Sequence, residues 1–480
     1  MLQDSIKGVG MKTQSKLIKF IMAILVIVTL KPGYLSACST FQFKHGDELF
    51  FGHNLNEPDM DVPGLIFINK RGILKHGRSF SELVSKTNEN PSNVIWISRY
   101  GSITMNNFGK DFADGGINEA GLYIWEMNEE AEYPQNKKLP RLMHMNWMQY
   151  VLDNYSTTEE VIQSTSKFQI DGWTWHYFVS DAQGNAASIE FFNGKVVVHQ
   201  GDQMPVPALF NTPYAREMEL IKYYKGFGGQ YEIEMNNPEV PRFVKTAKML
   251  KEYKGESPLE YSFEMLKKIK VYETPDWSVL IDTKKKLFYF KTSLYPEMKY
   301  FSYENIDFSN KTPCQILNID IAEGTDVLAN FKPYTDEMMK KIIDQLPIPE
   351  EGFLPKGSVS VSEFKNRLLN HHHASLKPET QFVAGNWKTE TSNDKNAVQW
   401  QVNLTMNKDA VTGEVLRTHE KTDISKIDHL YIKDNKLYMT YISVKAKNMV
   451  ELVAEIKGNK MYCEPFVGDQ SFAPYTLIKQ

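Results

Sequence analysis

Leu35-Ser36-Ala37-Cys38-Ser39-Thr40-Phe41 divides the chain into two parts of different character. Before this stretch lies an apolar segment of the kind that is removed on export, and after it begins a sequence of globular composition. Cleavage between Ala37 and Cys38 would give a protein that starts with cysteine. Such a residue carries a thiol and a free α-amine on one carbon, so that a nucleophile and a base lie together. The stretch therefore predicts that both the folded protein and its chemistry begin at Cys38.

Residues 11–37 are typical of a secretory signal. Lysines come first, residues 20–30 form an apolar run, and a short polar region ends in small residues. The apolar run is shorter than the roughly 20 residues that a membrane span needs. Met11 is a candidate start of the chain, because residues 1–10 resemble no part of a signal. We therefore expect residues 1–37 to be a signal peptide and the protein to be exported, to the periplasm or the extracellular space.

The same cleavage site permits a second interpretation. Leu35-Ser36-Ala37-Cys38 also fits a bacterial lipoprotein box, in which the cysteine is acylated on sulfur and nitrogen and loses its reactivity. Against this, Lys31-Pro32-Gly33-Tyr34 separates the apolar run from the cysteine, whereas lipid-modified cysteines usually follow the run closely. Contact with a membrane is expected only under this interpretation, as an outer-membrane lipoprotein.

The composition is that of an ordinary globular protein. The 480 residues are 42% hydrophobic and 24% charged, with a formal net charge of −4, and this length is enough for two or three domains. Residues 1–37 hold five lysines and one aspartate, so the rest of the chain is acidic and gives no electrostatic case for binding nucleic acid. Three cysteines are too few for a disulfide scaffold or a thiolate zinc site. Cys314 and Cys463 either pair or stay free.

Hydrophobic periodicity divides the rest of the chain into three. Residues 38–310 pass from strand-like segments to helical ones and back, which predicts an α+β fold with antiparallel sheets. Residues 311–375 carry two amphipathic helical segments and are predicted to form a helical linker. Residues 376–480 follow period two almost throughout, which predicts a small antiparallel barrel or sandwich. Helical spacing is found at residues 141–152, 215–225, 242–253, 335–346 and 361–369. A further helix is predicted to start at residues 157–162, with Ser156 or Thr157 as its cap. Residues 96–104 are predicted to continue the sheet of the first strands, and Asn193-Gly194 predicts a hairpin turn.

No cofactor or metal is expected. Neither GxGxxG nor GxxxxGK[ST] occurs between a strand and a helix. The run His371-His372-His373 is not expected to hold a metal, because three consecutive histidines do not converge easily and no acidic residue is patterned with them. A polar loop is the simpler interpretation of that run.

Several short motifs follow Cys38 in a fixed order. The sequences Gly52-His53-Asn54-Leu55-Asn56, Gly115–Leu122, Asn211-Thr212-Pro213 and Arg242-Phe243 succeed one another along the chain. With them, the region from Cys38 to about residue 303 resembles the choloylglycine hydrolase family, which includes bile salt hydrolases and penicillin V acylases. The resemblance implies a four-layer αββα fold of the N-terminal nucleophile hydrolases for residues 38–310. It also implies a hydrolase that acts on linear amides.

The resemblance assigns roles to individual residues. Cys38 corresponds to the nucleophile, and Arg242 to an arginine that lies beside it. Asn211 and the backbone N–H of Asn128 correspond to the donors that stabilise the oxyanion of the reaction. Asn56 stands where the family has an aspartate that holds the α-amine, and its amide oxygen still accepts a hydrogen bond.

The surroundings of the predicted nucleophile depart from the family in two places. His53 replaces the family's arginine, and Asn56 replaces its aspartate. The acidic residues between positions 57 and 61 are candidates for a replacement carboxylate. We expect His53, Trp125 and Met60 to contact the substrate.

The sequence thus favours an exported cysteine amidase that hydrolyses an acyl–amide bond of a small molecule through a thioester. An acyltransferase or a peptidase with the same nucleophile is an alternative enzyme. The alternative from another class is a surface lipoprotein with a degenerate hydrolase body, whose C-terminal β-domain binds a ligand or partner. Conjugated bile salts, penicillin V and N-acyl homoserine lactones all remain candidate substrates, and a homo-oligomer is compatible with the sequence.

Overall fold

The computed structural model describes residues 38–56, 64–87, 91–271, 277–373, 383–390, 397–407 and 409–480. The predicted signal peptide, Met60 and the acidic residues between positions 57 and 61 lie outside the described residues, as do the side chains of His371-His372-His373. Within the described ranges, no helix is both long and apolar enough to cross a membrane.

A six-stranded antiparallel sheet begins directly after Cys38. Its strand order is β14-β1-β2-β15-β16-β17. The strands are β1 (Ser39–His45), β2 (Glu48–Leu55), β14 (Ala208–Leu209), β15 (Trp277–Asp282), β16 (Leu287–Thr292) and β17 (Lys299–Ser302). The β1–β2 hairpin turns at Gly46, whose φ of 60° lies in the left-handed region that glycine adopts without strain. The register pairs Ser39 with Asn54 and so fixes which residues of β2 lie beside Cys38.

A nine-stranded sheet faces the first one. Its order is β13-β12-β11-β8-β7-β6-β3-β18-β19. The strands are β3 (Leu65–Asn69), β6 (Ser102–Asn106), β7 (Gly115–Asn118), β8 (Tyr123–Asn128), β11 (Trp175–Ser180), β12 (Ala186–Phe192), β13 (Lys195–Gln200), β18 (Gln315–Asn318) and β19 (Lys332–Pro333). The predicted turn at Asn193-Gly194 joins β12 to β13, and both residues have positive φ, of 50° and 68°. This is the backbone that a tight two-residue hairpin needs.

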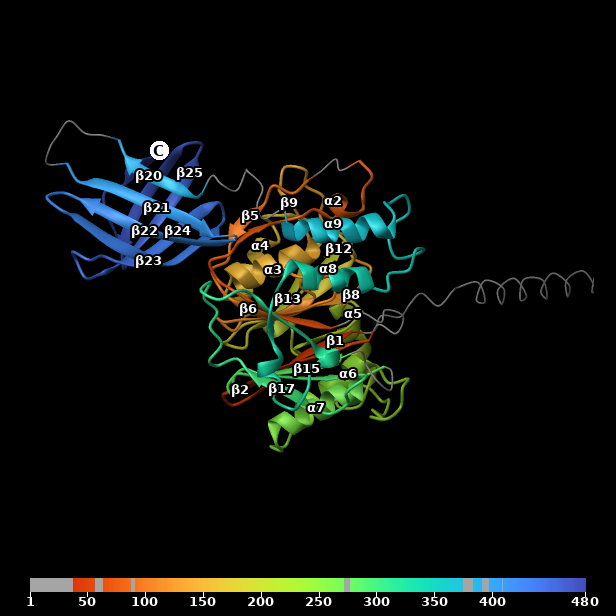
Figure 1. Ribbon diagram of the computed structural model, residues 1–480. Helices are drawn as coiled ribbons and strands as arrows, with labels where there is room; N and C mark the ends of the chain where they lie inside the picture. The colour runs from red at the N-terminus through yellow and green to blue at the C-terminus, as the bar shows by residue number, and fades with distance from the viewer. Residues whose placement is uncertain are drawn as a thin grey trace, which may run out of the picture. The chain divides into compact units, whose positions relative to one another are not determined.

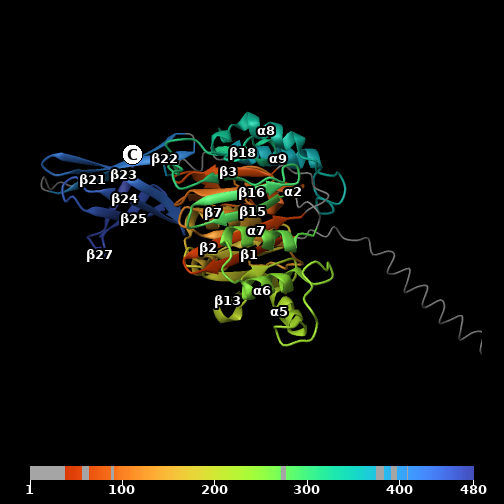
Figure 2. The ribbon, with the colours of Figure 1, turned by 90° about the horizontal axis from the view of Figure 1, so that it is seen from below.

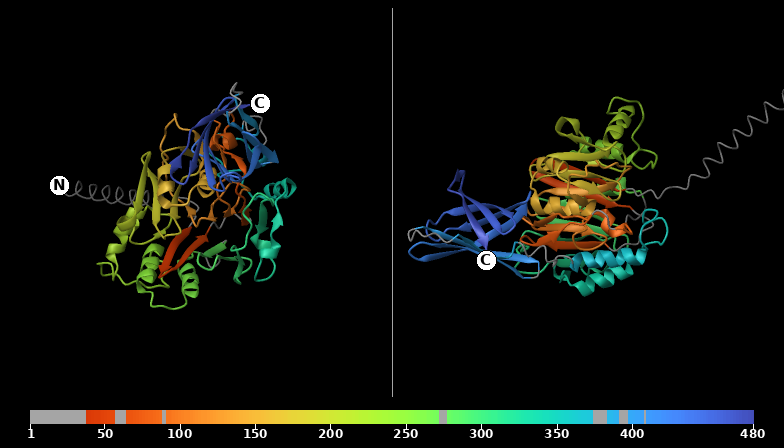
Figure 3. Two further views of the ribbon diagram at one scale, coloured as in Figure 1. Left: turned by 90° about the vertical axis from the view of Figure 1, so that its left-hand side faces the viewer. Right: turned by 90° about the horizontal axis from the view of Figure 1, so that it is seen from above.

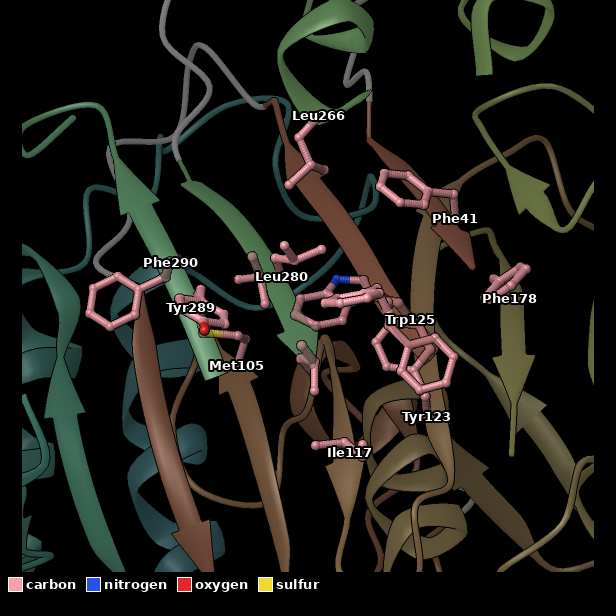
Figure 4. Close-up of a cluster of buried hydrophobic side chains, with 14 of the residues drawn as sticks. Phe41, Met105, Ile117, Tyr123, Trp125, Phe178, Leu266, Leu280, Tyr289 and Phe290 are labelled. Atoms are coloured by element: carbon pink, nitrogen blue, oxygen red, sulfur yellow. The ribbon is translucent and has the colours of Figure 1, made fainter. Parts of the chain in front are cut away.

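Helices cover the outer face of each sheet, and this gives four layers (Figure 1, Figure 3). The helices α6 (Arg242–Glu252) and α7 (Pro258–Ile269) pack on the six-stranded sheet, as Figure 2 shows from that side. The helices α3 (His144–Asn154) and α4 (Thr158–Ser164) pack on the nine-stranded sheet. Apolar side chains of both sheets, such as Phe41, Trp125 and Leu280, fill the space between them (Figure 4). The four-layer αββα prediction is confirmed, whereas α7 was not expected from the sequence.

The two facing sheets and the helices that cover them form the body of the molecule. Residues 311–375 are joined to this body more closely than a linker would be. Within them, β18 pairs with β3 and so extends the nine-stranded sheet. The helices α8 (Asp336–Gln345) and α9 (Val361–His373) follow. Their apolar residues, including Met339 and Phe364, belong to a core shared with α3 and with the outer face of that sheet. The pairing of β18 with a distant strand and the shared core both make this stretch part of the body. Local periodicity reveals neither connection.

The C-terminal region is a closed barrel of eight antiparallel strands, so the structure decides between barrel and sandwich. The strands are β20 (Gly385–Thr389), β21 (Gln399–Asn407), β22 (Ala410–Thr418), β23 (Thr422–Lys433), β24 (Lys436–Ile442), β25 (Met449–Lys457), β26 (Lys460–Val467) and β28 (Tyr475–Lys479). Pairing of β22 with β23 closes the barrel. Alternate side chains such as Trp387, Val402 and Leu452 fill its interior.

Short elements complete the fold. Two of them, β4 and β5, pair with each other, and Ile97 of β5 pairs with Ile432 of β23, so this hairpin joins the barrel's sheet. The sequence had suggested that residues 96–104 continue the body's sheet, but only β6 does so. The short elements are β4 (Leu74–His76), α2 (Phe80–Val84), β5 (Ile95–Ile97), β9 (Arg141–Met143), β10 (Gln169–Asp171), α5 (Tyr214–Leu220) and β27 (Gln470–Ser471).

Candidate active site

Arg242 joins two of the predicted site residues. It is the first residue of α6, and its Nη1 donates a hydrogen bond to the carbonyl oxygen of Cys38 at 2.9 Å. Its Nη2 donates to Oδ1 of Asn211 at 3.2 Å. The guanidinium also lies over the ring of Phe210, 5.0 Å from the centroid. A permanently charged, planar group is thus fixed at the start of β1 by contacts on several sides.

Asn211 is the next member of the cluster. It follows β14, and its Nδ2 donates to the carbonyl oxygen of Asn128 at 2.9 Å. Asn128 ends β8, opposite Trp175 of β11. Because Arg242 holds Oδ1 and Asn128 accepts from Nδ2, the orientation of the Asn211 amide is determined. The amide group has a second N–H, so it can still donate to another acceptor.

Asn56 lies at the same end of the sheet. The register of β1 and β2 pairs Ser39 with Asn54, so Asn56 comes two positions beyond that pair, next to Cys38 along the strand ends. Both Cys38 and Asn56 are fully buried. Asn54 has a structural part: its Oδ1 accepts from Ser278 Oγ at 2.6 Å, which ties β2 to β15. The fold therefore brings the residues that are predicted to be catalytic to the strand ends beside Cys38. Their catalytic roles stay predictions.

His53 and Trp125, predicted to contact substrate, lie in the core between the two sheets. Both side chains are fully buried, and their rings stack with centroids 4.2 Å apart and planes 21° apart (Figure 4 labels Trp125). Burial alone lowers the pKa of His53 well below its ordinary value. At neutral pH this chain therefore has an uncharged aromatic ring where the family has an arginine.

Sequence reasoning missed a buried acid beside this cluster. Glu217 lies on α5, close behind Asn211 in the chain, and is 6% exposed. Burial raises the pKa of its carboxyl to about 7, although the positive charge of Arg242 acts to lower it. Nothing in the local sequence distinguishes this glutamate from a surface residue of an amphipathic helix, so no sequence signal could have identified it.

The other two cysteines are not competitors for Cys38. Neither Cys314 nor Cys463 is in a disulfide bond in the structure, so the two do not pair. Cys314 lies beside Asn69 in the body, and Cys463 lies in the interior of the barrel. Burial raises the pKa of each of these two thiols to about 12. Both are therefore protonated and unreactive near neutral pH.

This arrangement is suited to acyl transfer. A thiol-bearing residue, a fixed cation and an oriented amide donor meet at the start of β1. Acyl transfer to a nucleophile needs donors that are already in place where negative charge develops on the carbonyl oxygen. The second N–H of the oriented Asn211 amide is a candidate for such a donor.

Comparison with known proteins gives a family match and several similar proteins. Residues 38–252 match the family described as linear amide C-N hydrolases, choloylglycine hydrolase family. The penicillin V acylase of Pectobacterium atrosepticum is 28% identical over 263 residues, which make up 45% of this chain and 69% of that protein. The structure of penicillin V acylase from Agrobacterium tumefaciens matches with a TM-score of 0.54 and 26% identity, covering 62% of this chain and 98% of the other. A variant of conjugated bile acid hydrolase from Clostridium perfringens matches with a TM-score of 0.47 and 16% identity, covering 60% and 98%.

Proposed function

Residues 38–252 belong to the choloylglycine hydrolase family of linear amide C–N hydrolases, and from this premise we propose an exported cysteine amidase whose nucleophile is Cys38. The single observation that carries the proposal is the pair of hydrogen bonds from Arg242, one to Cys38 and one to Asn211. These bonds connect the candidate nucleophile with the candidate oxyanion donor. The bond to Cys38 is accepted by its backbone carbonyl, so it holds a permanent positive charge beside this residue.

The proposed reaction begins with removal of residues 1–37. Cleavage frees the α-amine of Cys38, whose pKa of about 7.7–8.0 lies close to the thiol's value of about 8.5. The amine takes the thiol proton, and the sulfur attacks the carbonyl carbon of the amide. Negative charge develops on the carbonyl oxygen, where Nδ2 of Asn211 and the N–H of Asn128 donate hydrogen bonds.

Collapse of this tetrahedral intermediate breaks the carbon–nitrogen bond. The leaving amine takes the proton held by the α-amine, and the acyl group stays on sulfur as a thioester. Water then attacks the thioester, with the α-amine of Cys38 as its base. The products are a carboxylic acid and an amine, and the free thiol returns.

The proposed substrate is a small N-acyl amide. The curated relative is a penicillin V acylase, which makes a phenoxyacetyl amide the first candidate to test on this chain. His53 and Trp125 would contact the substrate in this proposal through its apolar acyl group, because both present buried rings. A neutral ring at position 53 gives no charge to attract an acidic substrate, so apolar acyl groups are favoured.

The test is kinetic and uses protein with a verified N-terminus. Cys38→Ala is expected to abolish hydrolysis in a panel of penicillin V, glycine- and taurine-conjugated bile salts and N-acyl homoserine lactones. Cys463→Ala, in the barrel, is the matched control and should keep full activity. Full activity in Cys38→Ala would exclude the proposal.

Intact mass of the purified protein tests export and the lipoprotein alternative together. A mature chain that begins with unmodified Cys38 supports the amidase. A mass increased by two or three acyl chains would show that the cysteine is a lipid anchor, and a chain that keeps residues 1–37 would contradict cleavage.

A further inference from the structure

Two ionisable residues behind the candidate oxyanion donor have no part in the proposed reaction. His176 lies on β11 and Glu190 on β12, and the register that pairs Tyr177 with Ile189 places them opposite each other. Both are fully buried. Burying an ionisable pair is costly unless its hydrogen bonds are satisfied. Their partners therefore indicate what the pair does.

The pair contacts both ends of the segment that carries Asn211. His176 Nε2 lies 2.5 Å from the carbonyl oxygen of Phe210. Oε1 of Glu190 accepts a hydrogen bond from the backbone N–H of Tyr214 at 2.9 Å. Asn211 lies between these two attachment points, so the backbone of residues 210–214 is fixed on both sides of it.

The contacts of His176 define a buried hydrogen-bonded pair. The carbonyl of Phe210 can only accept, so Nε2 of His176 carries a hydrogen. Nδ1 lies 3.4 Å from Oε1 of Glu190. Burial opposes ionisation of Glu190, but the hydrogen bond and charge of His176 hold the pKa of the carboxyl below its ordinary value. The two ring nitrogens of His176 thus connect the carbonyl of Phe210 with the carboxyl group of Glu190.

We propose that the His176–Glu190 pair positions Asn211 for catalysis by fixing the backbone of residues 210–214. Arg242 and Asn128 orient the Asn211 amide itself, whereas the His176–Glu190 pair places the Cα atom from which it extends. A donor that stabilises an oxyanion has to be held within about 0.5 Å of its place, which requires such support. His176 and Glu190 are positioning residues, and this role rests on the proposed function of Asn211.

The chain offers a matched control. His199 on β13 contacts the other oxygen of the same carboxylate, with Nδ1 3.1 Å from Oε2 of Glu190. Unlike His176, it makes no hydrogen bond to the 210–214 backbone in the described chain, and its side chain is 19% exposed. Its contact with this segment is between rings, with the centroid of His199 5.1 Å from that of Tyr214. His199→Gln should therefore keep kcat within about threefold of wild type.

Kinetics and thiol alkylation together separate positioning from general damage. His176→Phe should lower kcat for amide hydrolysis at least about 30-fold with KM within about threefold, and His176→Gln, which keeps an N–H donor, should recover part of the loss. Alkylation of Cys38 by iodoacetamide, followed by peptide mass spectrometry, should stay within about twofold because that reaction forms no oxyanion. Equal loss of alkylation and hydrolysis, or full kcat in His176→Phe, would overturn the proposal.

Hydrogen exchange tests the attachment without any substrate. In His176→Phe and Glu190→Gln, amide exchange in the peptide that spans residues 210–214 should speed up at least about tenfold, and in His199→Gln it should not. Unchanged exchange in the first two variants overturns the proposal. If the wild type hydrolyses no amide, the proposed function fails, whereas the exchange result still decides whether the pair fixes this segment.

Discussion

The body and the barrel of this molecule are both built from antiparallel strands, but they bury different side chains. In the barrel, Ser425 is the only polar residue that is buried among the described positions from 383 to 480. In the body, buried polar residues are numerous, and they include His176 and Glu190. These two residues and the half-buried Arg242 are hydrogen-bonded to the segment of residues 210–214. Buried polar groups cost stability unless they are satisfied. A hydrogen-bonded cluster of them in the body is therefore a candidate site.

Two arginines illustrate the same difference. Arg242 lies over Phe210 in the body, and Arg417 lies over Trp400 in the barrel, at 5.0 and 5.9 Å from the ring centroids. The aromatic contact is thus common to both regions. Of the two arginines, Arg242 alone donates hydrogen bonds to Cys38 and Asn211. Variants made in matched pairs, one in each region, test whether function resides in the body.

The largest effect is expected for the amide donor. Asn211→Ala removes a hydrogen bond to the oxyanion, so kcat/KM should fall about 10²–10³-fold, or about 2.7–4 kcal/mol of barrier. Asn403→Ala is the control, since this barrel asparagine also donates through Nδ2, to Glu414 at 2.8 Å. Steady-state kinetics on the best amide of the panel gives both values. Comparable losses in both variants would contradict the assignment of Asn211.

A smaller loss is expected at the arginine. Arg242→Ala removes two hydrogen bonds from a charged group, so kcat/KM should fall about 10–100-fold. Arg242→Lys should recover little, because one ammonium cannot reproduce the fork that reaches Cys38 and Asn211. Arg417→Ala in the barrel should leave kinetics unchanged. Equal kinetics in the two alanine variants would contradict a part of the bonds donated by Arg242 in the reaction.

Acid sensitivity should also come from the body. Burial lowers the pKa of His144 to about 3, against an ordinary value near 6.5. Between these values the unfolded chain binds a proton that the folded protein does not, so the free energy of unfolding falls as the pH is lowered from 6.5 towards 3. The contribution is at most about 1.4 kcal/mol per pH unit.

Denaturant unfolding at several pH values measures that dependence. His144→Asn should be less steeply dependent on pH over this interval than the wild type. His419→Asn, an exposed histidine of the barrel, should keep the wild-type dependence. An unchanged slope in His144→Asn would mean that other groups dominate acid unfolding.

The smallest effect is expected where barrel and body meet. Lys433 at the end of β23 pairs with Glu160 of α4 at 2.6 Å and lies over the ring of Tyr155. Partly exposed pairs of this kind contribute up to about 1 kcal/mol, so Lys433→Ala should lower the midpoint of thermal unfolding by a few degrees. Amide hydrolysis should not change. A large loss of activity would instead connect the barrel to the site.

Local sequence determined many elements of the fold correctly. Asn193-Gly194 predicted its hairpin, because the turn depends on positive φ at two adjacent residues. Of the two predicted caps, Thr157 is the N-cap of α4, and its side chain accepts a hydrogen bond from the backbone N–H of Glu160. These signals act within a few residues and need no distant partner. The motifs at Cys38, Asn211 and Arg242 likewise identified residues that the structure brings together.

Other features depend on pairings between distant segments. The stack of His53 on Trp125 joins β2 to β8 across the space between the sheets. Ile97 pairs with Ile432 across more than three hundred residues. No periodicity distinguishes such a strand from one that stays in the nearest sheet, because every amphipathic strand shows the same alternation.

Cys38 gives the clearest division between sequence and tertiary structure. The sequence by itself predicted it as the residue after a cleavable leader, and predicted its partners through a family resemblance. Tertiary structure alone decided that Arg242 connects it to Asn211, and that the His176–Glu190 pair lies behind that segment. The physical reason is range: caps, turns and leaders are set by neighbouring residues, whereas a buried polar cluster exists only when strands far apart in the chain fold against one another.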